Sequence, residues 1–151
     1  MIKLSRLTDY AVTLLTQMVS EDQAVWSASG LAEKTGLSLP TTSKILKQLN
    51  KSGIIGAQRG ASGGYKLNQP APDITIATIV EAMDGPIALT SCAEGGEQNC
   101  NVEKTCPMSG NWNKINRAVR RALDEVSLAD MAIPQPRKTA PDEAPQPGVS
   151  A

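Results

Sequence analysis

The three cysteines of the chain lie together in one short polar stretch, and this stretch limits what the chain can fold into. Cys92, Cys100 and Cys106 follow the spacing C-x7-C-x5-C, with two adjacent glycines between the first two. Cysteine ordinarily prefers a buried core, yet no apolar pattern in this segment would build one. Three thiolates that converge on a metal ion or an iron–sulfur cluster would order such a loop.

Other interpretations of the three cysteines stay open. They can be unrelated thiols in an unstructured loop. A disulfide would leave one thiol over, and nothing marks the chain as secreted. A structural zinc site usually shows paired C-x2-C spacings, which this sequence lacks.

Charge is unevenly distributed along the 151 residues, although the formal net charge is zero. Residues 1–68 hold eight Lys/Arg against four Asp/Glu, whereas residues 69–110 hold one Lys against six acids. The first half is therefore locally basic, as binding to nucleic-acid phosphates requires. Histidine is absent, which excludes Ser-His-Asp and Cys-His catalysis. Because nucleophile and nucleotide-loop motifs are also missing, we expect no enzyme.

Residues 29–50 show a helix-turn-helix pattern. A short helix over Ser29–Thr35 is followed by a tight turn at Gly36-Leu37, and Ser38 then caps a helix that runs to about Asn50. An ordinary helical hairpin is the alternative, because this pattern is only moderately specific. The exposed face of the second helix is predicted to carry Thr41, Thr42, Ser43, Lys44 and Lys47.

A glycine-rich hairpin follows and favours a winged helix. Ile54–Gln58 and Tyr65–Leu67 are predicted strands, and Arg59–Gly64 is the turn between them. Glycines such as Gly60 let the tip approach a DNA backbone closely, and Arg59 is placed to enter a minor groove. The turn lacks the G-x-x-x-x-G-K-[ST] pattern of a nucleotide-binding loop.

Three further helices complete the predicted fold. The first runs from Leu7 to Ser20, the second begins after Thr75, and a long third one covers Asn111–Val126. The long helix carries an apolar seam at spacings of 3 and 4 residues, which is typical of a coiled coil with a second copy of the chain. Its members are Trp112, Ile115, Val119, Ala122 and Val126.

We therefore predict a mainly α fold with a small β-hairpin wing, in which a winged helix-turn-helix DNA-binding domain precedes a long C-terminal dimerisation helix. The expected parts are residues 1–69 for DNA binding, 70–91 for a connecting helix and linker, 92–106 for the cysteine loop, 107–133 for dimerisation and 134–151 for a disordered tail. No apolar run reaches the ~20 residues that span a bilayer, and no signal peptide is evident. We expect a soluble, cytoplasmic protein.

The sequence resembles the family of iron–sulfur winged-helix transcriptional regulators that includes IscR, NsrR and RirA. The resemblance covers residues 1–131 and looks closest to the branch that regulates the SUF iron–sulfur assembly operon. Its specific part is the combination of the Arg-Gly-x-x-Gly-Gly-Tyr wing with three loop cysteines. The matching segments are Lys3–Val12, Leu31–Leu37, Arg59–Tyr65, Ile79–Ile87, Gly110–Trp112 and Leu128–Met131, together with the cysteines.

This resemblance implies a homodimer that binds a double-stranded DNA operator. It implies recognition helices in the major groove, with Thr41 and Ser43 facing base edges and Thr42, Lys44 and Lys47 nearer phosphates. Arg59 would be the minor-groove contact. It also implies a 2Fe-2S or 4Fe-4S cluster in each subunit, held by Cys92, Cys100 and Cys106.

The fourth ligand of such a cluster is not fixed by the resemblance. Some family members have a histidine three residues after the last cysteine, where this chain has Ser109. Asp9 is the leading candidate, because NsrR-type members have an aspartate at the matching place that reaches the cluster of the other subunit. Asp9 can equally be an ordinary acid of a first helical turn. Glu94, Glu97 and Glu103 stay open as alternatives.

The functional hypothesis is a cluster-sensing transcription regulator, with repression as the expected mode and iron–sulfur assembly or iron and redox genes as targets. A zinc or thiol-redox sensor that uses the same cysteines is the alternative. A small iron–sulfur electron carrier is a different class, which the recognition helix and the wing argue against.

Overall fold

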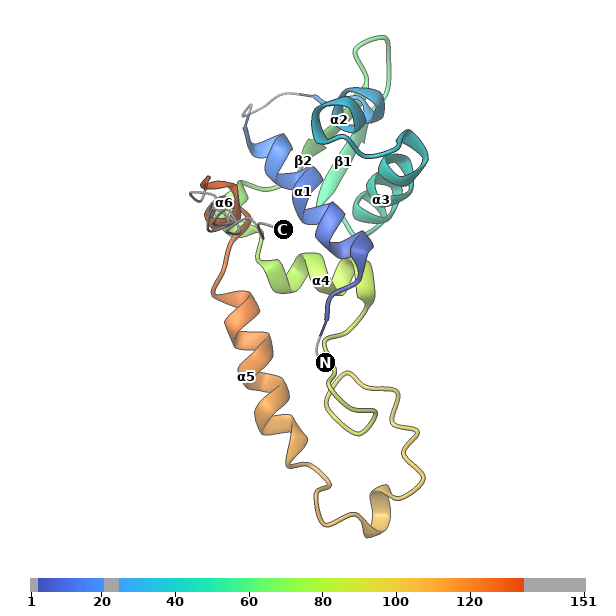
Figure 1. Cartoon of the computed structure of the whole chain (residues 1–151), viewed down its shortest axis with the longest axis vertical. Coiled ribbons are helices and arrows are strands. Elements are labelled where there is room, and N and C mark those ends of the chain that lie inside the picture. The colour runs from blue at the N-terminus through green and yellow to red at the C-terminus, as the bar shows by residue number, and fades with distance from the viewer. Residues whose placement is uncertain (1–2, 21–24, 135–151) are drawn as a thin grey trace, which may run out of the picture.

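The computed structural model describes residues 3–20 and 25–134. The predicted mainly helical fold with a hairpin wing is confirmed, while all but the first residue of the predicted tail lies outside the described residues. The elements in chain order are α1 (Arg6–Val19), α2 (Ala28–Thr35), α3 (Leu39–Lys51), β1 (Ile55–Gln58), β2 (Gly64–Leu67), a 3-10 helix (Ala71–Asp73), α4 (Ile76–Asp84), a second 3-10 helix (Glu103–Thr105), α5 (Trp112–Asp124) and α6 (Leu128–Ala132) (Figure 1).

Hydroxyl side chains start most of the helices. In each case the oxygen accepts a hydrogen bond from a backbone N–H of the first turn, which has no partner within the helix. Helix α2 ends at Gly36, whose φ of 73° is left-handed and therefore favours glycine. The capping residues are Ser5 for α1, Ser27 for α2, Ser38 for α3, Thr75 for α4 and Ser127 for α6.

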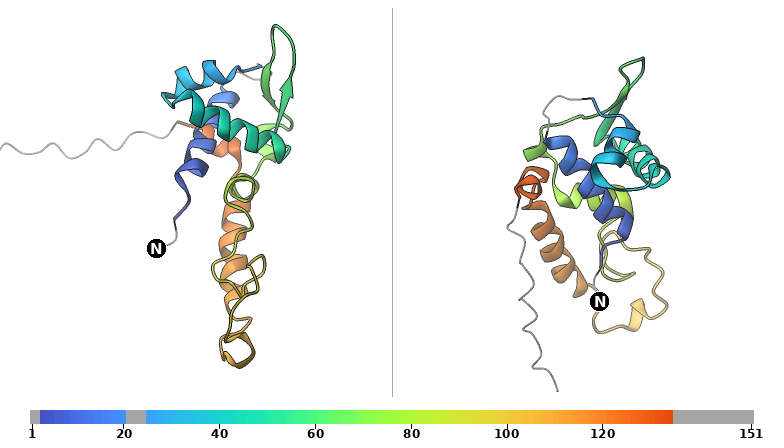
Figure 2. Two further views of the ribbon diagram at one scale, coloured as in Figure 1. Left: turned by 90° about the vertical axis from the view of Figure 1, so that its right-hand side faces the viewer. Right: turned by 45° about the horizontal axis from the view of Figure 1, so that its top comes forward.

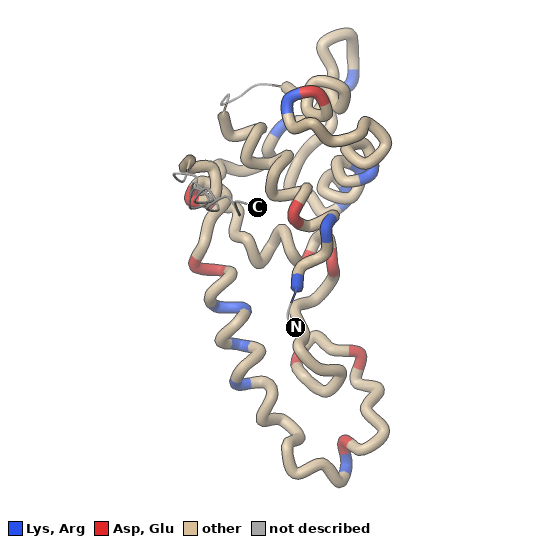
Figure 3. The backbone as a smooth tube through the Cα atoms, in the orientation of Figure 1, with Lys and Arg blue, Asp and Glu red and all other residues tan. Residues whose placement is uncertain are grey.

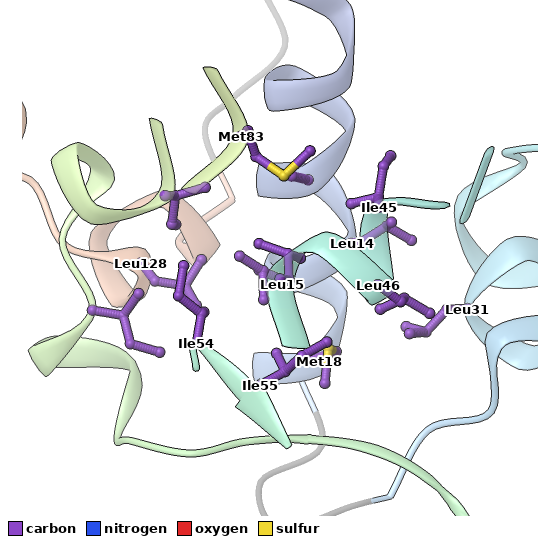
Figure 4. Packing of buried hydrophobic residues seen from close by; sticks show 14 of the residues in the cluster. Leu14, Leu15, Met18, Leu31, Ile45, Leu46, Ile54, Ile55, Met83 and Leu128 are labelled. Carbon is purple, nitrogen blue, oxygen red and sulfur yellow. The ribbon is translucent and has the colours of Figure 1, made fainter. Parts of the chain in front are cut away.

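One hydrophobic core joins the DNA-binding elements to the later helices. Leu14 and Leu15 of α1 lie at its centre, and the buried side chains of α3 pack around them (Figure 4). Met83 of α4 and Leu128 of α6 belong to the same cluster. Helices α4 and α6 are therefore built into the winged-helix body, because their apolar faces are covered by α1.

The wing is a short antiparallel ladder that pairs Ile55 with Leu67 and Ala57 with Tyr65. Trp26 adds a bridge to Tyr65, with reciprocal N–H···O bonds of 2.8 Å. Gly64 lies against this bridge, and a Cβ there would collide with the Trp26 carbonyl. The wing base therefore requires glycine at that position.

Helix α5 and the segment that contains the cysteines extend away from the body side by side. They leave it at the end opposite to the wing (Figures 1 and 2). After α5 the chain rejoins the body. There the backbone N–H of Ile76 donates to the Val126 carbonyl, and the backbone N–H of Leu128 donates to the Ile74 carbonyl. Within the described ranges, no helix is long and apolar enough to cross a membrane.

Candidate nucleic-acid interface and cysteine loop

The outer face of α3 forms the wall of a basic groove of about 930 Å³. Lys44 and Lys47 are exposed on this face, as the sequence predicts. Lys51, one turn further on, lines the same groove and was missed, because the helix was expected to end at Asn50. The spacing from Lys44 to Lys47 to Lys51 was the available signal, since residues three and four apart share a helix face. The groove is also lined by Pro40, Ser43, Gln48 and Ser52, and by Glu81 and Ala82 of α4.

The start of α3 presents fewer hydroxyls than the sequence suggested. Ser43 is half-buried and lines the groove. Thr41 is also half-buried, and its hydroxyl accepts a hydrogen bond of 2.8 Å from that of Ser38, within the cap of the helix. A contact from Thr41 to a DNA base would therefore have to compete with the helix cap.

The prediction that Thr42 lies on the exposed face is wrong. Its side chain is fully buried, because position 42 shares the inner face of α3 with Ile45, Leu46 and Leu49. Its hydroxyl has no hydrogen-bond partner among the described residues. Thr42 is thus a core residue, and it cannot contact a phosphate.

We expect Thr42→Val to stabilise the protein by about 1 kcal/mol, because a buried hydroxyl without a partner costs roughly 1–3 kcal/mol and valine has nearly the same shape. Urea unfolding should show a higher midpoint at an unchanged m-value. Thr41→Val is the matched control and should not stabilise, since it removes a hydroxyl that is hydrogen-bonded. A lower midpoint for Thr42→Val would contradict the burial argument.

The tip of the wing is exposed and carries Arg59 and Gly60. Gly60 has a φ of 120°, which disfavours any side chain, and its carbonyl accepts a bond of 2.9 Å from Gly63 N. A Cβ at Gly63 would lie 2.5 Å from the Gln58 carbonyl. The tip is therefore thin and built largely from glycine, and Arg59 comes directly before the first of these glycines.

Helix α3 is fastened to the end of α4 by one side chain. Nε2 of Gln48 donates to the carbonyls of Ala82 and Met83 at 3.0 and 2.9 Å. These carbonyls belong to the last turn of α4, where backbone oxygens lack partners within the helix. Gln48 therefore connects the helix that carries the basic face directly to the end of α4.

The start of α1 is fastened to the same end of α4. The backbone N–H of Ser5 donates to Oδ2 of Asp84 at 3.2 Å. Partial burial raises the pKa of the Asp84 carboxyl, but hydrogen bonds from Ser5 and Thr8 outweigh it and leave this pKa below its usual value. Asp9 lies exposed in the first turn of α1, beside this junction.

The structure does not gather the three cysteines. Each is half-buried and free of a disulfide. Among the described residues, no group of three Cys, Asp or Glu side chains is close enough to hold a metal ion, and this includes Asp9 and Glu94.

The helix-turn-helix, the glycine-built wing and the basic groove together define a winged-helix DNA-binding protein. The comparison with known sequences is more specific. The Rrf2 family, described as iron-dependent transcriptional regulators, matches residues 4–133, and the chain belongs to this family. It is a DNA-binding transcriptional regulator and not an enzyme.

Several relatives and solved structures are similar to the chain. Protein aau3 of Rhizobium meliloti is 26% identical over 136 residues, which cover 90% of this chain and 88% of that protein. The structure of CymR, the global cysteine regulator of B. subtilis, matches with a TM-score of 0.67 and 26% identity over 87% of this chain and 97% of that one. T. potens IscR matches with a TM-score of 0.62 and 27% identity over 86% and 85%.

Proposed function

We propose that this regulator senses iron–sulfur status through a cluster bound by Cys92, Cys100 and Cys106, and that it binds its operator as a homodimer. The observation that carries the proposal is the placement of three free thiols on a loop that joins α4 to α5. The resemblance to the SUF-operon branch suggests iron–sulfur assembly genes as targets and repression as the mode.

The apolar seam of α5 supports the homodimer. Trp112 and Ile115 are 38 and 48% exposed in the single chain, although their spacing is that of a packed interface. Helix α5 ends at Asp124 and not at Val126 as predicted, so Val126, which is 37% exposed, lies just beyond the helix. Exposed apolar side chains grouped on one helix face favour an interaction site. A second copy that covers this face would pair two recognition helices, which must lie about one turn of DNA apart to bind a palindromic operator together.

The DNA contacts follow from the exposed groups. In the proposed complex α3 lies in a major groove, where Lys44, Lys47 and Lys51 neutralise phosphates and Ser43 faces base edges. Arg59 at the tip of the wing reaches the flanking minor groove, and Gly60 allows the backbone to come close.

The donor set fits an iron–sulfur cluster in its chemistry, since cysteine thiolates are the ligands such clusters prefer. When bound, the cluster would supply sensitivity to iron supply or oxidation. Asp9 of a partner subunit is the proposed fourth ligand. Glu94, Glu97 and Glu103 are the alternatives in the loop, since the exposed pair of Glu94 with Arg117, at 3.1 Å, is a weak interaction.

The path from the loop to DNA runs through α4. The loop begins at the end of α4, where Gln48 of α3 and Ser5 of α1 are both fastened. A change in loop conformation at this point would alter the angle of α3, and two recognition helices in a dimer must keep their spacing to bind together.

The test is an absorbance spectrum with iron and sulfide analysis on protein purified without oxygen. Broad visible absorption with near-equal iron and sulfide is expected, and their number per chain would indicate the cluster type. Operator affinity is then measured for the loaded and the cluster-free protein. Equal affinities would contradict sensing even if the cluster is present.

A zinc or thiol-redox sensor is the second candidate. It is favoured by the similarity to CymR, which is named as a cysteine regulator and whose Staphylococcus aureus form has been solved in an oxidised state, at 27% identity and a TM-score of 0.63. A colourless protein that carries zinc, or that changes DNA affinity only on oxidation of its thiols, would support this candidate.

Lys47→Ala should weaken operator binding and reduce its salt dependence. The slope of log K against log salt is expected to fall by about 2 for the dimer, because each subunit loses one phosphate contact. Lys104→Ala is the control, since it makes the same charge change in the 3-10 helix Glu103–Thr105, at the far end of the molecule from the wing (Figures 1 and 3). If Lys47→Ala and Lys104→Ala show the same salt dependence of operator binding, the DNA does not contact the face of α3 that carries Lys47.

A further inference from the structure

We propose that Asn116 on α5 is a positioning residue that fixes the first half of the cysteine loop. In this proposal the hydrogen bonds of Asn116 hold Cys92 in position before any ligand binds. Cys100 and Cys106 then move toward Cys92 when the ligand binds. This inference rests on the proposed function only in assuming that the three thiols share one ligand.

Asn116 is the one described residue of α5 that is buried, with 3% of its surface exposed. A buried amide is costly unless it is hydrogen-bonded. Its Oδ1 accepts from the backbone N–H of Leu89 at 3.0 Å, and its Nδ2 donates to the carbonyls of Ile87 and Glu94 at 2.9 and 3.1 Å. One side chain thus holds three backbone groups that lie on both sides of Cys92.

Two neighbours on α5 strengthen this attachment. Oδ1 of Asn113 accepts from the backbone N–H of Glu94 at 2.8 Å, and Nη1 of Arg117 pairs with its carboxylate at 3.1 Å. Positions 113, 116 and 117 share one face of the helix. Glu94 is therefore held through its N–H, its carbonyl and its side chain.

The first half of the loop is also tightly folded on itself. Ala93 is fully buried, and Gln98 N donates to the Ser91 carbonyl at 2.8 Å. A Cβ at Gly96 would lie 2.6 Å from the Ser91 carbonyl, so the backbone there is closely packed. Cys92 sits inside this unit, with its Sγ 3.4 Å from the Thr90 hydroxyl.

The second half has no comparable attachment. Within the described ranges, the hydrogen bonds of residues 99–111 join residues two or three apart, such as Glu103 N to the Cys100 carbonyl and Ser109 N to the Cys106 carbonyl. Since the three sulfurs are not gathered, at least one must move to share a ligand. Moving Cys92 would break the Asn116 network, whereas moving Cys100 and Cys106 breaks only local turns.

The test is hydrogen exchange followed by mass spectrometry on cluster-free protein. Residues 87–98 should exchange more slowly than residues 99–106 in the wild type. Asn116→Ala should speed exchange over 87–98 by about ten- to a hundredfold, as expected when buried hydrogen bonds are lost. Asn111→Ala is the matched control, because Asn111 is exposed at the start of α5, does not cap the helix with its side chain, and donates only a weak hydrogen bond, to Sδ of Met108 at 3.9 Å, within the described residues.

A second variant distinguishes the loss of the Asn116 hydrogen bonds from unfolding of helix α5. Asn116→Leu keeps the side chain close to its original size and favours a helix, but removes the acceptor and both donors, so it should release Leu89, Ile87 and Glu94 while the helix content in circular dichroism stays the same. Alkylation rates should be lowest for Cys92 in the wild type and rise in both Asn116 variants. Equal exchange in the two halves of the wild-type loop, or no effect of Asn116→Ala, would overturn the proposal.

Ligand binding separates this inference from the proposed function. On reconstitution, exchange should slow mainly over residues 99–106, which supports movement of Cys100 and Cys106 toward Cys92. Slowing that is confined to 87–98 would overturn it. Failure of the wild type to take up iron and sulfide would overturn the proposed cluster, while the exchange difference between the two halves would still establish the role of Asn116.

Discussion

An Ile115→Asp variant is expected to be monomeric and to lose operator affinity by about 100-fold or more, because a dimer that binds two half-sites gains at least this factor over a single one. Ile115 lies in the exposed seam of α5, 48% exposed in the single chain. In a dimer the aspartate would be buried against apolar side chains without a partner, which is strongly unfavourable.

Analytical ultracentrifugation gives the oligomeric state, and fluorescence anisotropy with a palindromic operator gives the affinity. Lys114→Asp is the control, because it introduces the same acid at the adjacent position, outside the seam. Thermal unfolding should show a folded winged-helix body in both variants, since Ile115 is not part of the core. A dimeric Ile115→Asp protein would show that the α5 seam is not the interface.

The regular elements could be predicted because local rules decide them. A 3.6-residue apolar period, together with the Ser38 cap and the turn at Gly36, placed every helix boundary of the DNA-binding half within a residue or two. The wing followed from a glycine cluster between two short apolar strands. The same period also places Thr42 on the buried face, three residues before Ile45, but a polar side chain favours an exposed position and so gives the wrong prediction.

The attachments between elements could not be predicted. Gln48 and Asn116 bind backbone carbonyls, and every residue offers a carbonyl, so the sequence contains no signal for their partners. For the same reason the division of the cysteine loop into an attached and an unattached half is visible only in the structure. The cysteine spacing predicts the three donors of the proposed cluster, but it does not predict that their side chains lie apart in the structure.

Serine in place of Cys92, Cys100 or Cys106 is expected to abolish cluster binding almost completely. The serine hydroxyl keeps the size of the thiol but does not ionise at neutral pH, so it cannot replace a thiolate ligand. Iron, sulfide and visible absorption should be lost in all three variants. The fold should survive, because none of the three cysteines belongs to the hydrophobic core.

Two further variants test the ligand set from the opposite direction. Ser109→Cys adds a thiol three residues after Cys106, at the position where related regulators carry a histidine, and should slow cluster loss in air. Asp9→Asn should permit assembly but speed that loss, because it removes the proposed fourth ligand and leaves the three thiolates in place.

Cluster content at the wild-type level in any one Cys→Ser variant would exclude that cysteine as a ligand. Loss of zinc rather than iron in all three would assign the same thiols to the zinc sensor.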